Sequence, residues 1–315
     1  MALHRIYFIY LILFTILSYI IIYLFRRTDC NGWIYLLYWE EKMPSTYAHY
    51  KFGKEILKLL PREITEVIEG NKSLYMTGLH GPDILFYYKP LSKNEINTIG
   101  YALHEKEAVY FFLEAFKKIS NIQSKNAPLS YIYGFLCHYA LDCECHKYID
   151  EQITRSGISH AEIEVEFDRM LMIEDGLNPI TQNLTTHINT VEKDCNIISA
   201  FFNGISPKQI EHSLNSMKIC HKLLLARSNI KRNFLYAILK ITGNYPQMHG
   251  LIVNKEPNPG CLESNRILAQ KYTDAQAFAV SLIMEFSQAL TENNPQFSKR
   301  FFKTFSGKEA ENIAL

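Results

Sequence analysis

Apolar residues recur at helical spacing through most of the chain after Tyr50, and this pattern constrains the fold more than any other feature. No run of alternating apolar and polar residues between hairpin turns accompanies it, so a sheet is not expected. We therefore predict an all-α protein, a multi-helix bundle followed by a short helix and a loose tail after 292. The predicted helices span 50–69, 93–119, 129–154, 159–172, 181–202, 207–227, 231–242 and 263–290.

The N-terminal segment, residues 1–42, differs in character from the rest. Twenty residues from Ile6 to Phe25 contain no charge, glycine or proline, and a helix of that length would span about 30 Å of hydrocarbon. Arg5 and the pair Arg26-Arg27 flank it, and no small-residue cleavage site follows. The pattern favours a single transmembrane helix over a removable signal peptide, and the positive-inside rule places the body in the cytoplasm.

A second interpretation of this segment comes from the genetic code. The codons for Trp39-Glu40-Glu41-Lys42-Met43 can read GGGAGG a few bases before an ATG, as a bacterial ribosome-binding site does. In that case Met43 is the true start, residues 1–42 are a mis-called extension, and the protein is cytoplasmic without an anchor. Both interpretations remain open from the sequence.

Composition narrows the class of protein. Thirty-three Lys and Arg against 32 Asp and Glu give a net charge of +1, so the electrostatic attraction that duplex-tracking proteins need is missing, and no nucleic acid duplex is expected as a partner. Seven cysteines in a chain this long are not a dense disulfide framework, so we expect reduced thiols.

Histidines and carboxylates gather in one part of the chain at spacings that suit a metal. His138, Asp142 and His146 stand at i, i+4 and i+8, on one face of an otherwise apolar helix. A divalent cation would offset the cost of burying them. Cys143 and Cys145 then point elsewhere and are expected to be packing residues.

Other residues extend this set. His160 and Glu164 form a second i, i+4 pair on another helix, and two such pairs on facing helices are a usual way for a bundle to enclose metal. His49, Asp83 and His104 lie at or near helix ends, Asp83 in a Gly81-Pro82 turn. Each alone is more typical of a core histidine or a solvated pair, but together they supply eight N and O donors, which suit two or three ions. We interpret His80 as a loop residue, and four others as structural: His187, His212, His221 and His249.

The order of these motifs resembles the bacterial zinc-dependent phospholipase C family. The resemblance runs from Met43 to about Glu174, through the segments 43–53, 81–83 and 134–142 and then His146, His160 and Glu164. It implies an all-α fold with three zinc ions at the bottom of a cleft, and a general-base role for Asp83. The implied ligands are Asp83, His104, His138 and Asp142 for one ion; His146, His160 and Glu164 for a second; and His49 with a bridging Asp142 for a third.

The sequence departs from the secreted members of that family at three points. Only three residues separate Asp142 from His146, fewer than in those enzymes. The N-terminal Trp that supplies third-zinc ligands in them has no evident counterpart, and the added β-sandwich lipid-binding domain is absent. The third zinc is therefore the one that the resemblance supports least.

The resulting expectation is a zinc-dependent phosphodiester hydrolase that cleaves phospholipid to diacylglycerol and a phosphorylated headgroup, with the membrane surface as a possible contact. Two alternatives are a nuclease or nucleotidase that uses the same zinc site, and a membrane-associated zinc-binding protein without turnover. We expect a catalytic helical domain at 43–202 and a C-terminal helical extension at 203–315 packed on it.

Overall fold

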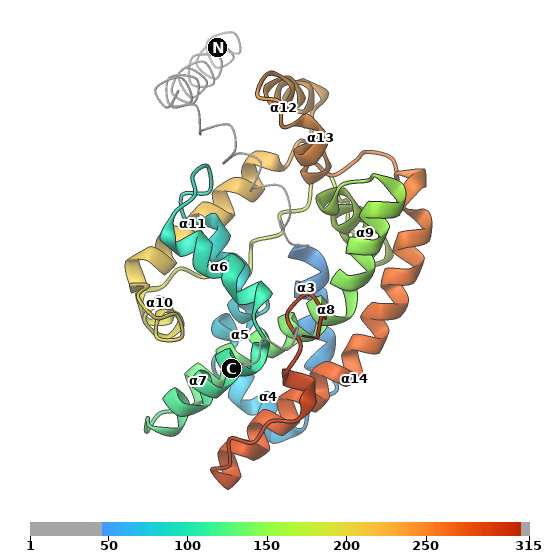
Figure 1. Cartoon of the computed structure of the whole chain (residues 1–315). Helices are drawn as coiled ribbons and strands as arrows, with labels where there is room; N and C mark the ends of the chain where they lie inside the picture. Colours follow the sequence, from blue (N-terminus) through green and yellow to red (C-terminus); the bar gives the residue numbers. More distant parts are fainter. Residues whose placement is uncertain (1–45, 310–315) are drawn as a thin grey trace. The chain divides into compact units, whose positions relative to one another are not determined.

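A computed structural model describes residues 46–309, which belong to one compact unit. Within that range the chain is helical and forms no β-strand, only two isolated β-bridges, which confirms the all-α prediction. Figure 1 shows the order of the helices. They are α3 (Thr46–Ile56), α4 (Arg62–Glu69), α5 (Lys72–Gly78), η2 (Gly81–Tyr87), α6 (Glu95–Glu105), α7 (Ala108–Ser120), α8 (Asn126–Ser156), α9 (His160–Glu174), α10 (Glu192–Ser199), α11 (Pro207–Leu224), α12 (Asn229–Ile241), α13 (Tyr245–Met248), η3 (His249–Leu251), η4 (Pro259–Cys261), α14 (Leu262–Glu292) and η5 (Lys299–Phe301).

Helix α8 is the centre of the bundle, and its 31 residues carry three of the candidate ligands. Helices α3, α4, α5, α7, α9, α10 and α14 all contact it. Helix α5 packs tightly on it, because Gly78 and Gly134 face each other's helix. A Cβ added at Gly134 would overlap the carbonyl oxygen of Tyr75, and one at Gly78 would overlap that of Tyr131. The two glycines therefore allow backbone-to-backbone packing one helical turn before His138.

Several predicted helices have different bounds in the structure. The predicted helix 50–69 is divided into two, because α3 ends at Ile56, turns follow, and α4 begins directly after Pro61. The predicted helix 93–119 is divided at Lys106, where the backbone becomes extended. Of the predicted helix 181–202 only α10 is an α-helix, and the preceding residues form turns. Ser159 caps α9, since its hydroxyl accepts the N–H of Glu162 at 3.3 Å.

The last part of the chain returns to the centre of the bundle. Helix α14 packs along α8, α9 and α3. Residues 299–309 then cross between α7 and α8, where the N–H of Ala108 donates to the carbonyl of Lys303 at 3.0 Å. Phe301 and Phe305 are fully buried there. The prediction of a loose tail after 292 is therefore wrong as far as residue 309, because two aromatic side chains anchor this segment.

The transmembrane helix predicted at 6–25 lies outside the described residues. None of the helices within 46–309 combines the length and the apolar character that crossing a bilayer requires. The six cysteines in this range are free thiols, in line with the expectation from composition.

Candidate metal centre

The structure brings all eight predicted ligand residues into three adjoining groups. In each group, one nitrogen or oxygen per residue lies within 4.8 Å of the others, and every member is buried. The groups are His49, His138 and Asp142; Asp83, His104 and His138; and His146, His160 and Glu164. We refer to them as the first, second and third group.

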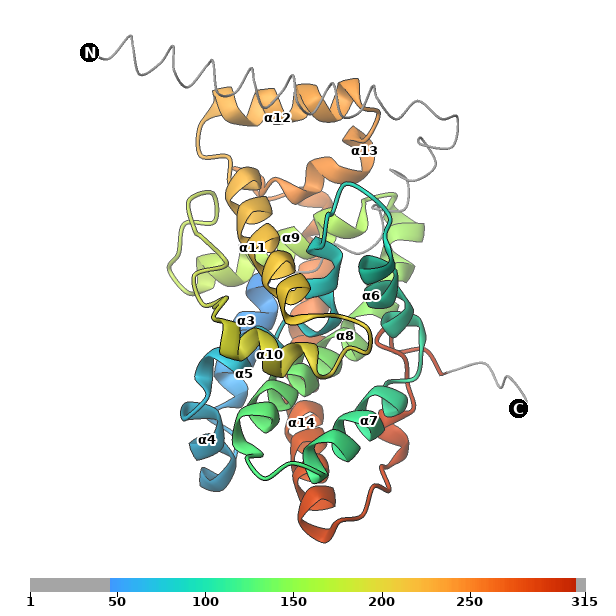
Figure 2. The ribbon, with the colours of Figure 1, turned by 90° about the vertical axis from the view of Figure 1, so that its left-hand side faces the viewer.

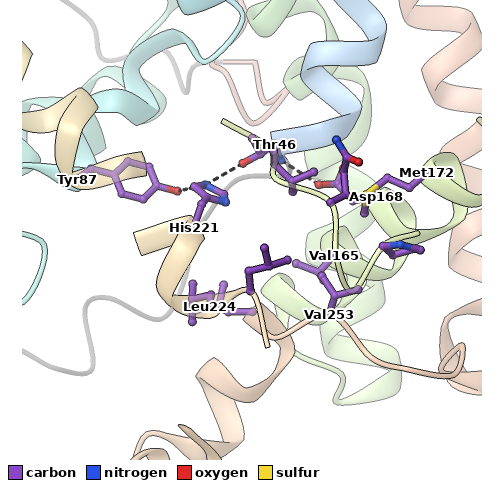
Figure 3. A pocket seen from close by; sticks show the side chains of 13 residues that line it. Thr46, Tyr87, Val165, Asp168, Met172, His221, Leu224 and Val253 are labelled. Carbon is purple, nitrogen blue, oxygen red and sulfur yellow. Dashed lines mark hydrogen bonds between the residues drawn. The ribbon is translucent and has the colours of Figure 1, made fainter. Parts of the chain in front are cut away.

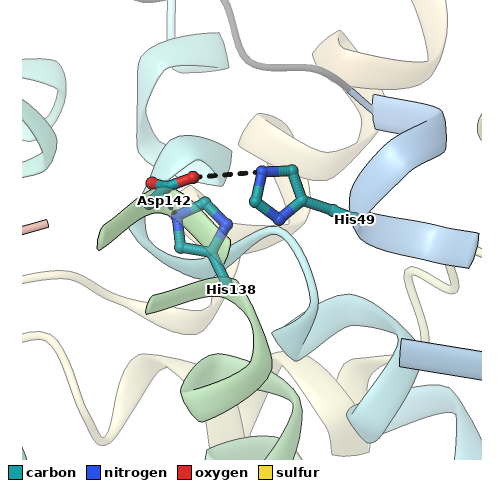
Figure 4. Close-up of side chains that lie close together, drawn as sticks. All are labelled: His49, His138 and Asp142. Carbon is teal, nitrogen blue, oxygen red and sulfur yellow. Dashed lines mark ion pairs between the residues drawn. The ribbon is translucent and has the colours of Figure 1, made fainter. Parts of the chain in front are cut away.

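The first group joins α3 to α8. His49 Nε2 lies 3.1 Å from Asp142 Oδ1, and His138 Nε2 lies 3.0 Å from Asp142 Oδ2 (Figure 4). The two imidazoles stack with their centres 4.5 Å apart. Because His138 and Asp142 are one turn apart on α8, the helix itself fixes their separation.

The second group depends on the tight approach of η2 to α8. Gly81 has a φ of +47°, and a Cβ at this position would overlap the imidazole of His138, so only glycine fits. Asp83 Oδ1 lies 2.9 Å from His104 Nε2, and Asp83 Oδ2 lies 3.6 Å from His138 Nε2. His104 Nδ1 donates to the carbonyl of Gly100 at 2.8 Å, which fixes the tautomer and leaves Nε2 free to bind a metal.

The third group joins α8 to the start of α9. Glu164 Oε1 lies 3.2 Å from His160 Nε2 and 3.4 Å from His146 Nε2. His146 Nε2 also lies 3.6 Å from Asp142 Oδ1, so the short spacing between these two residues still allows the third group to adjoin the first. A cavity of about 20 Å³ borders this junction.

Asp142 lies where the resemblance implies a bridging ligand. Its oxygens are closest to His49 and His138, and His104 Nε2 is 3.9 Å away. His138 belongs to both the first and the second group. Asp142 belongs to the first group and adjoins His146 of the third, so one imidazole and one carboxylate connect the three groups.

The donor atoms of these residues suit a bound cation better than they form hydrogen bonds with one another. Buried side chains should have hydrogen-bond partners, and an unpaired polar atom in the interior costs roughly 1–3 kcal/mol. Here several buried atoms have no hydrogen bond: His49 Nδ1, Asp83 Oδ2, His138 Nδ1 and Nε2, Asp142 Oδ2, His160 Nε2 and Glu164 Oε2. Imidazole nitrogens and carboxylate oxygens are the donors that zinc takes in proteins.

Comparison with known families agrees with this donor set. A family model described as zinc dependent phospholipase C matches residues 48–212, more than half of the chain. The chain belongs to the zinc-dependent phospholipase C family. No curated protein and no solved structure gives a significant match. Zinc is therefore the cofactor, and hydrolysis of phosphodiester bonds is the activity that the family implies.

The neighbouring histidines favour the ionised form of two carboxylates in this candidate centre. Burial raises the pKa of Asp142, but the nearby imidazoles of His138, His146 and His49 outweigh it and hold that pKa well below the usual value. Burial likewise opposes ionisation of Glu164, yet His160 and His146 lower its pKa to about 2. Desolvation disfavours the charged form of His146, and the neighbouring carboxylates still raise its pKa to about 9. The carboxylates of Asp142 and Glu164 thus carry the negative charge that a bound cation would neutralise.

Three further histidines, interpreted from the sequence as loop or structural residues, lie around this candidate centre. His80 Nε2 and His187 Nε2 lie 2.7 Å apart, and the ring of His187 stacks on Tyr50 with centres 4.4 Å apart. His221 Nε2 lies 3.2 Å from both Thr46 Oγ1 and Tyr87 Oη. Desolvation lowers the pKa of both His187 and His221 to about 4, and burial lowers that of His80. All three are therefore neutral at pH 7.

An apolar cavity of about 60 Å³ lies next to the N-terminus of α3, one helical turn before His49 (Figure 3). Its polar edge contains Thr46, Tyr87, Asp168 and His221, and no sequence motif pointed to it. The rest of its lining is mainly apolar, with one amide: Val165, Met172, Pro179, Gln182, Leu184, Leu224, Leu225, Leu251 and Val253.

Proposed function

We propose that this protein hydrolyses the phosphodiester bond of phospholipids in a zinc-dependent reaction, releasing diacylglycerol and the phosphorylated headgroup. The observation that carries the proposal is the convergence of eight buried His, Asp and Glu side chains into three connected groups. These residues come from α3, η2, α6, α8 and α9, within a family match that spans the same helices. The apolar cavity one turn from His49 supports a substrate with acyl chains.

The eight residues have defined roles in this proposal. Two or three zinc ions would be held by His49, Asp83, His104, His138, Asp142, His146, His160 and Glu164. Bound zinc supplies Lewis acidity, which activates water and stabilises charge on phosphate and leaving-group oxygens. His138, which belongs to two groups, and Asp142, which adjoins the third, fix the spacing of the site because both project from helix α8.

We assign Asp83 as the general base. Its Oδ1 lies 2.9 Å from His104 Nε2, whereas its buried Oδ2 has no hydrogen-bond partner. That oxygen can accept a proton from the attacking water as the new P–O bond forms. The P–O bond to diacylglycerol then breaks, and the departing oxygen takes up a proton from solvent.

Parallel assays on three substrates test the proposed reaction. The full chain is incubated with phosphatidylcholine, single-stranded DNA and a nucleotide, and zinc is counted by elemental analysis. We expect at least two zinc ions per chain, release of phosphocholine, loss of activity with a chelator and recovery when zinc is added. The His138→Ala variant should be inactive on every substrate.

Each other outcome points to a different function. Cleavage of DNA or the nucleotide without phosphocholine release would favour the nuclease or nucleotidase. Bound zinc without turnover on any substrate would favour a non-catalytic zinc protein. Unimpaired hydrolysis by the metal-free chain would contradict a zinc enzyme of any kind.

We further propose that residues 43–202 are the catalytic domain and that 203–315 extend it. Contacts of α14 with α8 and of α11 with η2 support this division of roles, because both partner elements carry candidate ligands. The cytoplasm is the proposed location of the helical body, where its six cysteines stay reduced.

A further inference from the structure

Helix α12 presents an apolar stripe to solvent. Ile230, Phe234, Ala237 and Ile241 follow one another at spacings of four, three and four residues, so they share one face of the helix. Ile230 is 77% exposed and Ile241 is 83% exposed, Ala237 is exposed, and Phe234 is half-buried. A helix of a globular protein normally turns such a stripe toward the core.

The opposite face of α12 is held inward by a charged residue. Arg232 lies about 200° around the helix from Ile230 and is buried. Its guanidinium donates to the carbonyl of Val253 at 2.7 Å and to that of Ala226 at 3.4 Å. Lys231 Nζ donates to the carbonyl of Leu225 at 2.9 Å. These bonds orient α12 so that its apolar stripe faces outward.

The segment of the chain that contains α12 has basic residues and no acidic ones. No Asp or Glu occurs between Glu211 and Glu256, although the whole chain is nearly neutral. This segment contains seven cations: Lys218, Lys222, Arg227, Lys231, Arg232, Lys240 and Lys255. Lys222, Arg227, Lys240 and Lys255 are exposed.

We propose that α12 is an interfacial helix that docks the protein on an anionic phospholipid surface. Such helices combine an apolar face that enters the headgroup region with Lys and Arg that bind anionic lipids, each worth about 1 kcal/mol near the surface. A second copy of the chain fits this face poorly. A two-fold interface would bring the same basic residues together from both subunits.

The position of α12 connects membrane docking to the apolar cavity beside the candidate metal centre. Figure 2 shows α12 running across the end of α11. Leu224 and Leu225, at the turn between these helices, line the apolar cavity, as do Leu251 and Val253 beside the bonds of Arg232. Docking through α12 therefore brings the cavity toward the bilayer. The inference does not depend on turnover, because a protein without catalysis could bind the same surface.

Tryptophan quenching tests the contact directly. The full-length Ile241→Trp variant is mixed with vesicles of phosphatidylcholine and phosphatidylglycerol that carry brominated acyl chains, and Leu59→Trp serves as control. Leu59 is 53% exposed between α3 and α4, away from the basic segment. We expect the added fluorescence of Ile241→Trp to be quenched and blue-shifted, with no such change for Leu59→Trp. The parent chain in the same brominated vesicles corrects for Trp33 and Trp39.

A second measurement addresses affinity and the competing occupants. The double variant Ile230→Ser/Ile241→Ser should bind these vesicles roughly tenfold more weakly in a quenching titration of the Phe234→Trp chain. The pair Leu59→Ser/Leu91→Ser in the same background should bind as the parent does. Hydrolysis of a short-chain phosphatidylcholine below its micelle concentration should be unchanged, which separates docking from catalysis.

Three results would overturn the proposal. They are equal quenching of both Trp variants, no quenching of Ile241→Trp, and a chain mass by light scattering that doubles and returns to one copy in the Ile230→Ser/Ile241→Ser variant. The last result would assign the face to a second copy. A chain that docks but hydrolyses nothing would refute the proposed function and leave the docking intact.

Discussion

Asp142 is the residue on which the candidate metal centre depends most. Its two oxygens lie 3.1 Å from His49, 3.0 Å from His138 and 3.6 Å from His146, so one carboxylate adjoins side chains from α3 and from two further turns of α8. Because three imidazoles surround it at these distances, the carboxylate is buried away from solvent. Its negative charge is therefore placed to attract any cation bound beside it. Replacing this carboxylate with a neutral group of the same shape should therefore weaken metal binding at more than one position.

The Asp142→Asn variant should lose at least one zinc ion per chain and more than about 100-fold of its phosphodiesterase activity, because even outer partners of metal ligands are worth roughly 10–100-fold. Elemental analysis and initial rates at saturating zinc measure the two effects. Glu144→Gln, which changes a half-buried carboxylate on the same helix, is the matched control and should keep both. Full zinc occupancy in Asp142→Asn would show that this carboxylate is not a ligand.

At the scale of elements, the position of His49 depends on a contact between α9 and α3. The carboxylate of Asp168 accepts the N–H groups of Thr46, Tyr47 and Ala48 at 3.0, 2.9 and 2.7 Å. It thus satisfies the amides at the N-terminus of α3, where the helix dipole also favours negative charge. Because His49 is the next residue along, α9 positions a candidate ligand on another helix.

Asp168→Ala should lower the free energy of unfolding by about 2–3 kcal/mol, since it removes charge-assisted hydrogen bonds and leaves buried amides unpaired. Asp168→Asn, which keeps an acceptor, should lose less. Urea unfolding monitored by circular dichroism measures both, and Asp274→Ala, at an exposed position of α14, should stay within about 0.5 kcal/mol of the parent. A loss that small in Asp168→Ala would show that α3 does not need this cap.

Helices could be predicted from the sequence where apolar residues recur at helical spacing over several turns and a capping residue marks the end of the helix. Helices α8, α9 and α14 were predicted nearly to their ends, because their apolar residues recur over several turns and Ser159 provides a cap. The i, i+4 spacing on α8 and α9 likewise predicted which side chains meet. The structure of residues 181–191 was not predictable, since Leu184 and Ile188 pack on the core while Val191 is 51% exposed, so the segment has no continuous apolar face.

At the scale of the whole molecule, the surroundings of the site come from residues far apart in the chain. His187 reaches His80 from 107 positions away, His221 reaches Thr46 from 175, and Phe305 packs 5.4 Å from the ring of His104. No local sequence motif predicts such contacts, because they depend on how α11, α14 and the loops pack over the bundle. Sequence reasoning therefore found the candidate ligands and missed the shell around them.

This shell predicts that the protein loses stability in acid. The folded state holds the pKa of His187 and His221 near 4, against about 6.5 for an exposed imidazole, because burial disfavours the charged form. Below pH 6.5 the unfolded chain therefore binds more protons than the folded one, and stability falls until about pH 4. Between pH 7 and pH 5 each histidine should account for about 2 kcal/mol of lost stability.

His221→Gln tests the sign and the size of this effect. The amide can still bond to Thr46 and Tyr87, but it does not titrate, so the loss of unfolding free energy between pH 7 and pH 5 should shrink by about 2 kcal/mol. Urea titrations at both pH values on variant and parent give this difference, in which zinc release is common to both chains and cancels. His212→Gln, at an exposed position of α11, should show the parent's pH dependence. An unchanged pH dependence in His221→Gln would mean that this imidazole is not kept neutral by folding.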